Sequence, residues 1–228
     1  KRWDRMAKAF TRCGKEITIA VRQGGSSPDD NPSLRRAIQN ARAVNMPKDK
    51  IQAAIAKASG NDGGADYQEI LYEGYGPHGV AILVETATDN PTRTVANVRH
   101  HFKKGGGNMG NSGSVSFMFN KMCAFRLKPD GVERDELELT LIDYGLEELT
   151  DGEDNDGNPI LIAYGAFTSF GDLQGGLEEV GIEPVSSGAE WIPTATTELD
   201  EGQTDEVLAL IDRLEQDDDV QSVFHTLS

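Results

Sequence analysis

Residues 149–164, LTDGEDNDGNPILIAY, carry the pattern that decides the fold of this chain. Two strand-like runs, 149–154 and 159–164, flank the turn pair Asp156-Gly157, which is a β-hairpin signal. One strand and one helix are expected before the hairpin, and one helix and one strand after it, at residues 123–127, 134–146, 172–180 and 182–192. This βαββαβ order is complete in itself and predicts a ferredoxin-like domain over residues 121–194.

The sequence on either side of this unit predicts a second α/β domain. Strands at 70–75 and 80–86 surround the turn Gly76-Pro77-His78-Gly79, and a helix and a further strand follow at 90–104 and 114–119. A helix at 198–214 and a strand at 220–224 are left over by the ferredoxin-like unit, whereas residues 61–120 are short of one helix. The most economical arrangement is a discontinuous middle domain, 61–120 plus 195–228, with the acidic ferredoxin-like domain inserted.

Residues 1–60 predict a bundle of three amphipathic helices. Apolar residues recur at three- and four-residue steps along the first helix, which gives it one apolar stripe: Trp3, Met6, Ala7, Phe10, Cys13, Ile17, Ala20 and Val21. Gly14 is a candidate break in this helix. The second helix begins near Asn31-Pro32, and the third begins at Pro47 and ends at Gly60. The expected fold class is α+β with three domains, an N-terminal helical bundle plus two α/β-sandwich (ferredoxin-like) domains, one inserted in the other.

The formal net charge of −16 is distributed very unevenly. Residues 1–60 carry 13 Lys and Arg against 5 Asp and Glu, residues 61–134 carry 8 of each, and residues 135–228 carry one base against 25 acids. The total therefore does not argue against a nucleic-acid partner, because association depends on local potential. The acidic remainder either serves solubility alone or binds a basic partner, and it is expected to point away from any bound polyanion.

Two groups of cations are the candidate nucleic-acid contacts. The first belongs to the helical bundle: Lys8, Arg12, Lys15, Arg22, Arg35, Arg42, Lys48 and Lys50. The second lies on the outer arc of the helix at 90–104: Arg93, Arg99, His100, Lys103 and Lys104. Such residues pair with phosphates and give affinity with little base specificity. The alternative is that both groups are ordinary solvated helix faces.

No motif for catalysis, a cofactor or a metal stands out. The glycine run 105–113 follows a helix and precedes a strand, which is the wrong order for a nucleotide-phosphate loop, although its backbone N–H groups could still meet a polymer phosphate. Residues 151–157 resemble a calcium loop but lack two ligands. The histidines and the two cysteines show no zinc spacing, and no nucleophile motif is present. We therefore expect no enzyme activity, no cofactor and no metal.

The chain is also expected to be cytoplasmic. It has two cysteines, no signal peptide and no run of about 18 apolar residues that could span a membrane. We expect no membrane partner and a monomeric protein.

Several ordered motifs resemble the YebC/PmpR family over nearly the whole chain. In the middle segment they are Tyr72-Glu73-Gly74-Tyr75-Gly76-Pro77, Thr88-Asp89-Asn90, Arg93-Thr94-Val95, Val98-Arg99-His100 with Phe102, Gly106-Gly107-Asn108-Met109-Gly110 and Gly113-Ser114-Val115. In the first 60 residues they are Ala20-Val21-Arg22-Gln23-Gly24, Asp30-Asn31-Pro32 and Asn45-Met46-Pro47-Lys48-Asp49. The acidic insert and tail match in the order of elements more than in residues.

The resemblance implies the same three-domain architecture and a non-enzymatic role on nucleic acid. Members of this family are described as DNA-binding transcriptional regulators, as ribosome-associated factors that relieve stalling, and, in mitochondria, as translational activators. The function expected first is therefore a DNA-binding transcriptional regulator, and the alternative is a translation factor that binds ribosomal or messenger RNA. A protein-interaction module whose acidic domain binds the ribosome or a basic protein is the second alternative. The family usually begins with a basic arm, and part of that arm is expected to precede Lys1.

Overall fold

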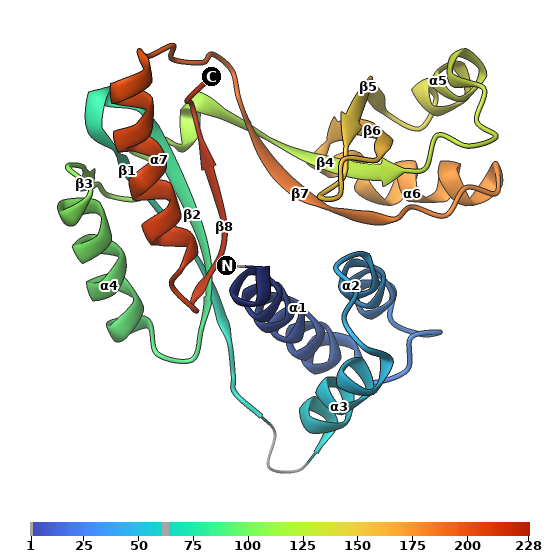
Figure 1. Cartoon of the computed structure of the whole chain (residues 1–228). Helices are drawn as coiled ribbons and strands as arrows, with labels where there is room; N and C mark the ends of the chain where they lie inside the picture. The colour runs from blue at the N-terminus through green and yellow to red at the C-terminus, as the bar shows by residue number, and fades with distance from the viewer. Residues whose placement is uncertain (1, 61–63) are drawn as a thin grey trace. The chain divides into compact units, whose positions relative to one another are not determined.

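A computed structural model describes residues 2–60 and 64–228 (Figure 1). The chain divides into two compact units, the first formed by residues 1–119 and 193–228 and the second, the inserted unit, by residues 120–192. The described residues form a group of three N-terminal helices, two separate four-stranded sheets and four further α-helices. The expected α+β class is confirmed. The boundary between a helical and an α/β domain inside the first unit stays a prediction.

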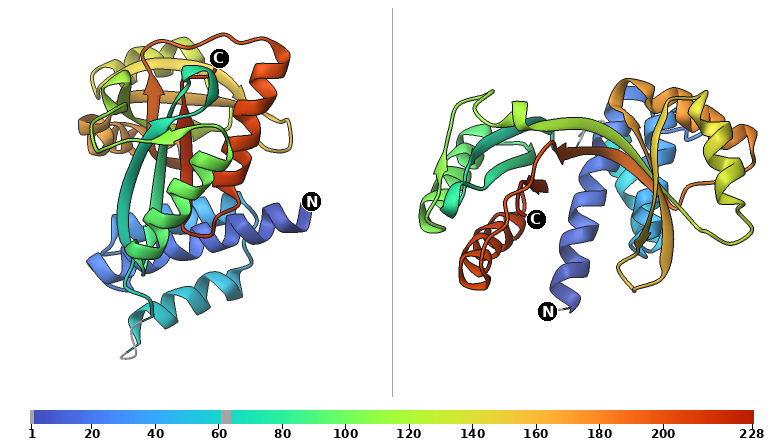
Figure 2. Two further views of the ribbon diagram at one scale, coloured as in Figure 1. Left: turned by 90° about the vertical axis from the view of Figure 1, so that its left-hand side faces the viewer. Right: turned by 90° about the horizontal axis from the view of Figure 1, so that it is seen from above.

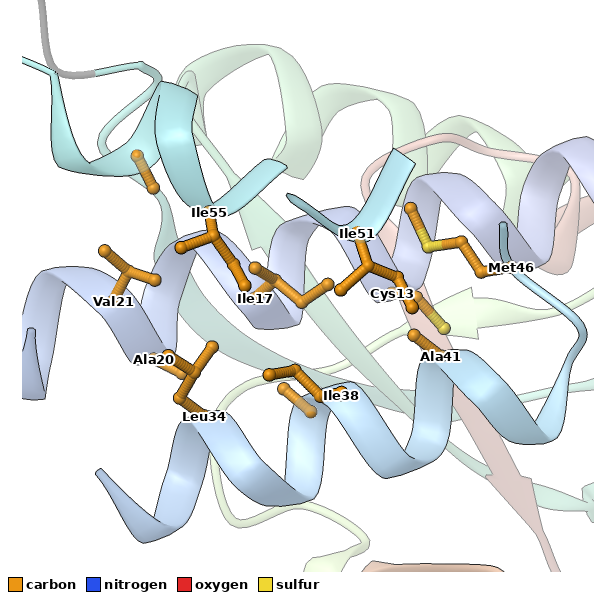
Figure 3. Packing of buried hydrophobic residues seen from close by; sticks show 12 residues of the cluster. Cys13, Ile17, Ala20, Val21, Leu34, Ile38, Ala41, Met46, Ile51 and Ile55 are labelled. Carbon is orange, nitrogen blue, oxygen red and sulfur yellow. The ribbon is translucent and has the colours of Figure 1, made fainter. Parts of the chain in front are cut away.

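The head, residues 2–60, consists of α1 (Arg2–Gly24), α2 (Pro32–Ala43) and α3 (Lys48–Ser59). Their apolar faces form one cluster around Ile17 and Leu34, both fully buried (Figure 3). Asn31 caps α2 by accepting a hydrogen bond from the Leu34 N–H, and its amide donates to the carbonyls of Ala20 and Gly25 at 2.8 and 2.9 Å. The break expected at Gly14 does not occur, because α1 runs through this residue without interruption.

The first sheet has the order β3-β1-β2-β8, and its pairings are antiparallel. Its strands are β1 (Gln68–Tyr75), β2 (Ala81–Thr88), β3 (Asn108–Met109) and β8 (Val220–His225). Helices α4 (Pro91–Lys104) and α7 (Glu201–Glu215) lie side by side and bury Phe102 and Leu210 in one cluster with Ile82 (Figure 2). Helix α7 begins later than expected because Asp200 and Gln203 form a capping box.

The strand expected at residues 114–119 was wrong. Residues Ser116–Met118 form a short 3₁₀ helix, and the sheet instead gains its edge strand β3 inside the glycine run. The physical reason is that the backbone N–H groups of Gly113, Val115 and Ser116 all donate to the carboxylate of Glu73. These donors are therefore not available to a strand ladder.

The inserted unit has the βαββαβ order that its sequence predicts. It consists of β4 (Phe119–Leu127), α5 (Arg134–Ile142), β5 (Leu146–Glu153), β6 (Pro159–Ala166), α6 (Phe170–Glu179) and β7 (Ser186–Pro193). The sheet order β5-β6-β4-β7, with β6 antiparallel to both β4 and β5, is the ferredoxin-like arrangement. Helix α5 ends four residues before the expected Leu146, because Gly145 takes a φ of 97° and turns the chain into β5.

Candidate nucleic-acid interface

One face of α1 carries a basic stripe, which consists of Lys8, Arg12 and Lys15. This basic stripe meets the segment that joins α7 to β8. Lys8 donates to the Gln216 carbonyl and forms an ion pair with Asp218. Arg12 donates to the carbonyl of Glu215 at 2.6 Å and to that of Val220 at 3.2 Å. We call Asp217–Asp219 the acidic turn. Two of the predicted phosphate contacts thus face backbone carbonyls and an acid of their own chain.

Lys15 lies deepest in this contact. Its ammonium group donates to the carbonyls of Ala87 and Asp218 at 2.8 and 2.6 Å and lies 3.6 Å from the Asp219 carboxylate. Only 7% of the residue is exposed. Burial lowers the pKa of Lys15, and the charge of Asp219 opposes that shift only in part. In this arrangement Lys15 is closed to any ligand.

Asp219 joins the head to α4. Its carboxylate accepts hydrogen bonds from Arg93 Nη2 and Thr94 Oγ1, each at 2.8 Å, and Arg93 also bonds Asp89 at 3.1 Å. Burial would raise the pKa of Asp219, but the hydrogen bonds from Arg93 and Thr94 and the charge of Lys15 outweigh it and lower the pKa. At the neighbouring position, His101 Nε2 lies 2.9 Å from the Asp217 carboxylate. Arg93 is half-exposed, but its guanidinium is already paired with the carboxylates of Asp89 and Asp219.

The remaining candidates on α4 are exposed side chains. They occupy the outer face of the last two turns: Arg99, His100, Lys103 and Lys104. None of these four forms an ion pair with the residues that the structure describes. Arg99, Lys103 and Lys104 are cations near the C-terminal end of a helix, where the helix dipole favours positive charge. We call this group the α4 patch.

The candidates on α2 and α3 divide into paired and exposed residues. Arg35 donates to the carbonyls of Pro28 and Asp29 at 2.8 and 3.0 Å, within its own helix-to-helix connection. Arg42, Lys48 and Lys50 are exposed, and the Lys50 ammonium lies 5.2 Å from the centre of the Phe10 ring. The remaining candidate, at the end of α1, is the exposed Arg22, whose guanidinium lies 3.4 Å from the Gly64 carbonyl.

The glycine run is closed by a buried acid. Glu73, 3% exposed, accepts the N–H groups of Gly113, Val115 and Ser116 at 2.6, 3.0 and 2.7 Å. Burial would raise the pKa of Glu73, but these three backbone hydrogen bonds, together with one from the Ser116 side chain, outweigh it and lower the pKa. An internal carboxylate therefore occupies donors that a polymer phosphate would otherwise meet. The run also needs glycine for packing, because a Cβ on Gly107 would lie 2.3 Å from the Tyr75 carbonyl.

The described residues offer no metal or thiolate chemistry. Within residues 2–60 and 64–228, no three His, Cys, Asp or Glu side chains gather as a metal site. Both cysteines are buried and unpaired, and burial raises the pKa of Cys13 to about 12 and also raises that of Cys123. Both thiols thus stay protonated at neutral pH. No helix in the described part of the chain is both long and apolar enough to cross a membrane.

Two family models cover almost the entire chain. The TACO1/YebC N-terminal domain matches residues 1–61, and the TACO1/YebC second and third domain matches residues 67–227. The chain belongs to the TACO1/YebC family. This finding agrees with the resemblance that the sequence motifs indicated.

Relatives of this TACO1/YebC protein are similar over nearly their whole length. A protein of Anaeromyxobacter dehalogenans strain 2CP-C is 57% identical, and one of Myxococcus xanthus is 56% identical. Each comparison covers 100% of this chain and 94% of the relative, and both relatives are named probable transcriptional regulatory proteins. A conserved hypothetical protein from Aquifex aeolicus, whose crystal structure is known, is 36% identical in sequence to this chain. The two structures match with a TM-score of 0.82, and the match covers 97% of this chain and 90% of that one.

Sequence reasoning missed the two acids that organise the site. Asp219 follows two further acids between an expected helix and an expected strand, and this charge run opposite a basic helix was a usable signal. Glu73 interrupts the otherwise apolar and aromatic run of the strand expected at residues 70–75, so its burial required a partner that was not identified. Both acids bind groups that are distant in sequence, which no local pattern reveals.

Proposed function

We propose that this TACO1/YebC protein is a nucleic-acid-binding regulator of gene expression. The first hypothesis is that it binds DNA and regulates transcription, and the alternative is that it binds RNA on the ribosome and regulates translation. The names of the relatives support regulation, and the α4 patch supports a polyanionic partner. The patch carries the proposal because its cations keep their charge uncompensated in a chain of net charge −16. The proposal requires neither catalysis nor a second copy of the chain.

The α4 patch favours contact with phosphate rather than with bases. Arg99, Lys103 and Lys104 are long, exposed cations on one helix face, and such residues supply affinity that does not depend on sequence. Of the predicted contacts, Arg42, Lys48 and Lys50 of the head are exposed in the same way. We therefore assign the α4 patch and these three head residues to the phosphate contact.

Salt titration of binding tests the proposal. For duplex DNA the logarithm of the affinity should fall with the logarithm of salt concentration by about 0.9 per phosphate neutralised, and by about 0.7 on single strands. The Lys103→Ala/Lys104→Ala variant should bind more weakly with a shallower slope and an unchanged melting temperature, because exposed charges contribute little to stability. Lys128→Ala/Arg213→Ala removes the same charge from exposed positions outside the patch and should bind as the wild type does.

A comparison of duplex DNA with purified ribosomes separates the two readings. Preference for ribosomes at equal salt concentration would favour the translation reading, and preference for duplex DNA the transcription reading. Failure to bind either, or equal losses in the two double variants, would exclude the α4 patch as a nucleic-acid contact.

A second candidate function, protein binding by the inserted unit, is supported by a groove on α5. Glu136, Leu139, Thr140, Asp143 and Tyr144 line a shallow groove of about 590 Å³, and Leu139 is 72% exposed. An apolar side chain between acids suits a partner segment that is both basic and apolar. Leu139→Ser should abolish capture of such a partner without changing nucleic-acid binding.

A further inference from the structure

The head is docked on the rest of the first unit through polar groups. The buried residues of its hydrophobic cluster lie between Cys13 and Ala58. Those of the cluster under the first sheet lie within residues 80–102 and 207–220, so the two clusters have no residue in common. The contacts between α1 and the segment that follows α7 are ion pairs and hydrogen bonds of Lys8, Arg12 and Lys15. Separation of the head would therefore open neither cluster.

The groups that meet the basic stripe of α1 present the same chemistry as a phosphate backbone. Lys8 and Lys15 each have a carboxylate within ion-pair distance, and Arg12 donates to two carbonyl oxygens. Ammonium and guanidinium groups bind phosphate oxygens with the same charge-assisted hydrogen bonds. The three cations recur at steps of four and three residues, so they line one face of α1 over about 10 Å.

We propose that Lys8, Arg12 and Lys15 form a cryptic binding site for a nucleic-acid phosphate backbone, which the acidic turn and its flanking carbonyls cover as an internal phosphate mimic. A polyanion competes with the acidic turn for Lys8 and Lys15 and with the carbonyls of Glu215 and Val220 for Arg12, and the site opens when the head leaves this segment. Lys15 shows why opening is required, because it is buried beneath the contact. The inference rests on the proposed function, because it assigns a second contact to the same kind of ligand.

Competition predicts that weakening the turn strengthens nucleic-acid binding. In the docked state the acidic turn both occupies the cations and repels an approaching phosphate. Each exposed ion pair contributes up to about 1 kcal/mol, which corresponds to a factor of about five in affinity. Asp219 must be kept, because it also holds Arg93 and Thr94. Asp217 must be kept as well, because its carboxylate accepts the Asp219 N–H at 3.0 Å and lies 2.9 Å from His101 Nε2. Asp218, which pairs with Lys8, is the acid to change.

The test compares Asp218→Asn with Asp156→Asn in the full chain, using a labelled DNA duplex and a single-stranded RNA of the same length. Both variants remove one negative charge, but the second removes it from the exposed connection between β5 and β6. The turn variant should bind about fivefold more tightly than this control at low salt. Its salt slope on duplex DNA should be steeper by about 0.9 for each cation that is released. Adding Lys8→Ala/Arg12→Ala should cancel the gain.

Equal affinity of the turn variant and its control would overturn the inference, as would a gain that survives Lys8→Ala/Arg12→Ala. The Lys103→Ala/Lys104→Ala variant tests the proposed function separately. If this variant loses nucleic-acid affinity while the turn variant binds as its control does, only the cryptic site is refuted. Absence of binding in every variant would refute both. Asp218→Asn should leave the melting temperature nearly unchanged, because this side chain is 71% exposed.

Discussion

Glu73 and Asp219 are buried acids that the fold stabilises by different means. Glu73 receives mainly backbone N–H groups from the connection after β3, whereas Asp219 receives the side chains of Arg93, Thr94 and Lys15. A buried carboxylate without such donors would cost several kcal/mol. Each acid therefore fixes a segment that is distant in sequence: Glu73 fixes the glycine run, and Asp219 fixes the head and the start of α4.

Replacing Glu73 with glutamine should destabilise the protein by about 1–3 kcal/mol at neutral pH. The amide of Glu73→Gln keeps one acceptor but presents an NH₂ group to backbone donors, which leaves a buried N–H unsatisfied. Urea unfolding measures the change. Glu69→Gln, on an exposed position of the same strand, is the control and should leave stability unaltered.

The loss in Glu73→Gln should also depend on pH. The folded pKa of Glu73 is lower than its ordinary value of 4.5, so the ionised carboxylate stabilises the fold above that value. This contribution disappears as the pH falls through the lower, folded pKa. The stabilities of the wild type and the variant should therefore converge in acid. A constant difference from neutral to acidic pH would show that the charge of Glu73 does not contribute.

The sequence alone did not reveal which groups the cations of α1 contact. The apolar stripe of α1 was predictable, and Cys13, Ile17, Ala20 and Val21 are all buried. The polar side of an amphipathic helix, however, says nothing about what it meets. Lys15 remains a predicted phosphate contact, and in this structure it is held by Asp219 and two carbonyls, all more than 70 positions away in the chain.

At the scale of elements, the space around each helical glycine decides whether alanine can replace it. In α6, a Cβ added to Gly175 meets no atom within 4 Å, whereas one added to Gly176 lies 2.6 Å from the Tyr144 ring. Gly175→Ala should stabilise the protein by about 0.4–1 kcal/mol, because alanine restricts the unfolded chain. Gly176→Ala should destabilise it by about 1–3 kcal/mol through overpacking. Thermal unfolding of the two variants checks this contrast between neighbours.

Gly14 extends the same reasoning to α1. Its added Cβ meets no atom within 4 Å, so Gly14→Ala should stabilise the head by a similar amount. A lower melting temperature for Gly14→Ala would indicate that the flexibility of this position, rather than its packing, matters for the fold.

The type of each helix or strand could largely be predicted from the periodicity of its residues. Several element boundaries, however, depend on contacts between residues that are distant in sequence. The hairpins and helices of the inserted unit were predictable because alternating and helical patterns are local. The glycine run was not, because β3 forms where Gly107 lets the chain approach Tyr75 and Glu73 takes the donors after it. The α4 patch was predictable from its helical spacing, whereas the pairing of Arg93 with Asp219 was not.

At the scale of the whole molecule, the inserted unit leaves the first unit at two adjacent points. The Thr194 N–H and hydroxyl both donate to the Met118 carbonyl, at 2.9 and 3.1 Å. The two ends of residues 120–192 are therefore close in space, although they lie far apart in sequence. The inserted unit also keeps its own cluster around Phe125, Leu141 and Leu173. A short linker should be able to replace it.

Replacing residues 120–192 by about four Gly and Ser residues should leave the first unit folded. This segment holds 4 Lys and Arg against 17 Asp and Glu, so its removal takes away −13 of the total charge of −16. Duplex DNA should then bind more tightly at low salt, where screening extends over about 30 Å, and the gain should shrink at physiological ionic strength. Circular dichroism and a salt series of binding curves measure both effects. An unfolded shortened chain would contradict the independence of the units, and a folded one with unaltered affinity at low salt would show that the acidic unit lies beyond the reach of the bound polyanion.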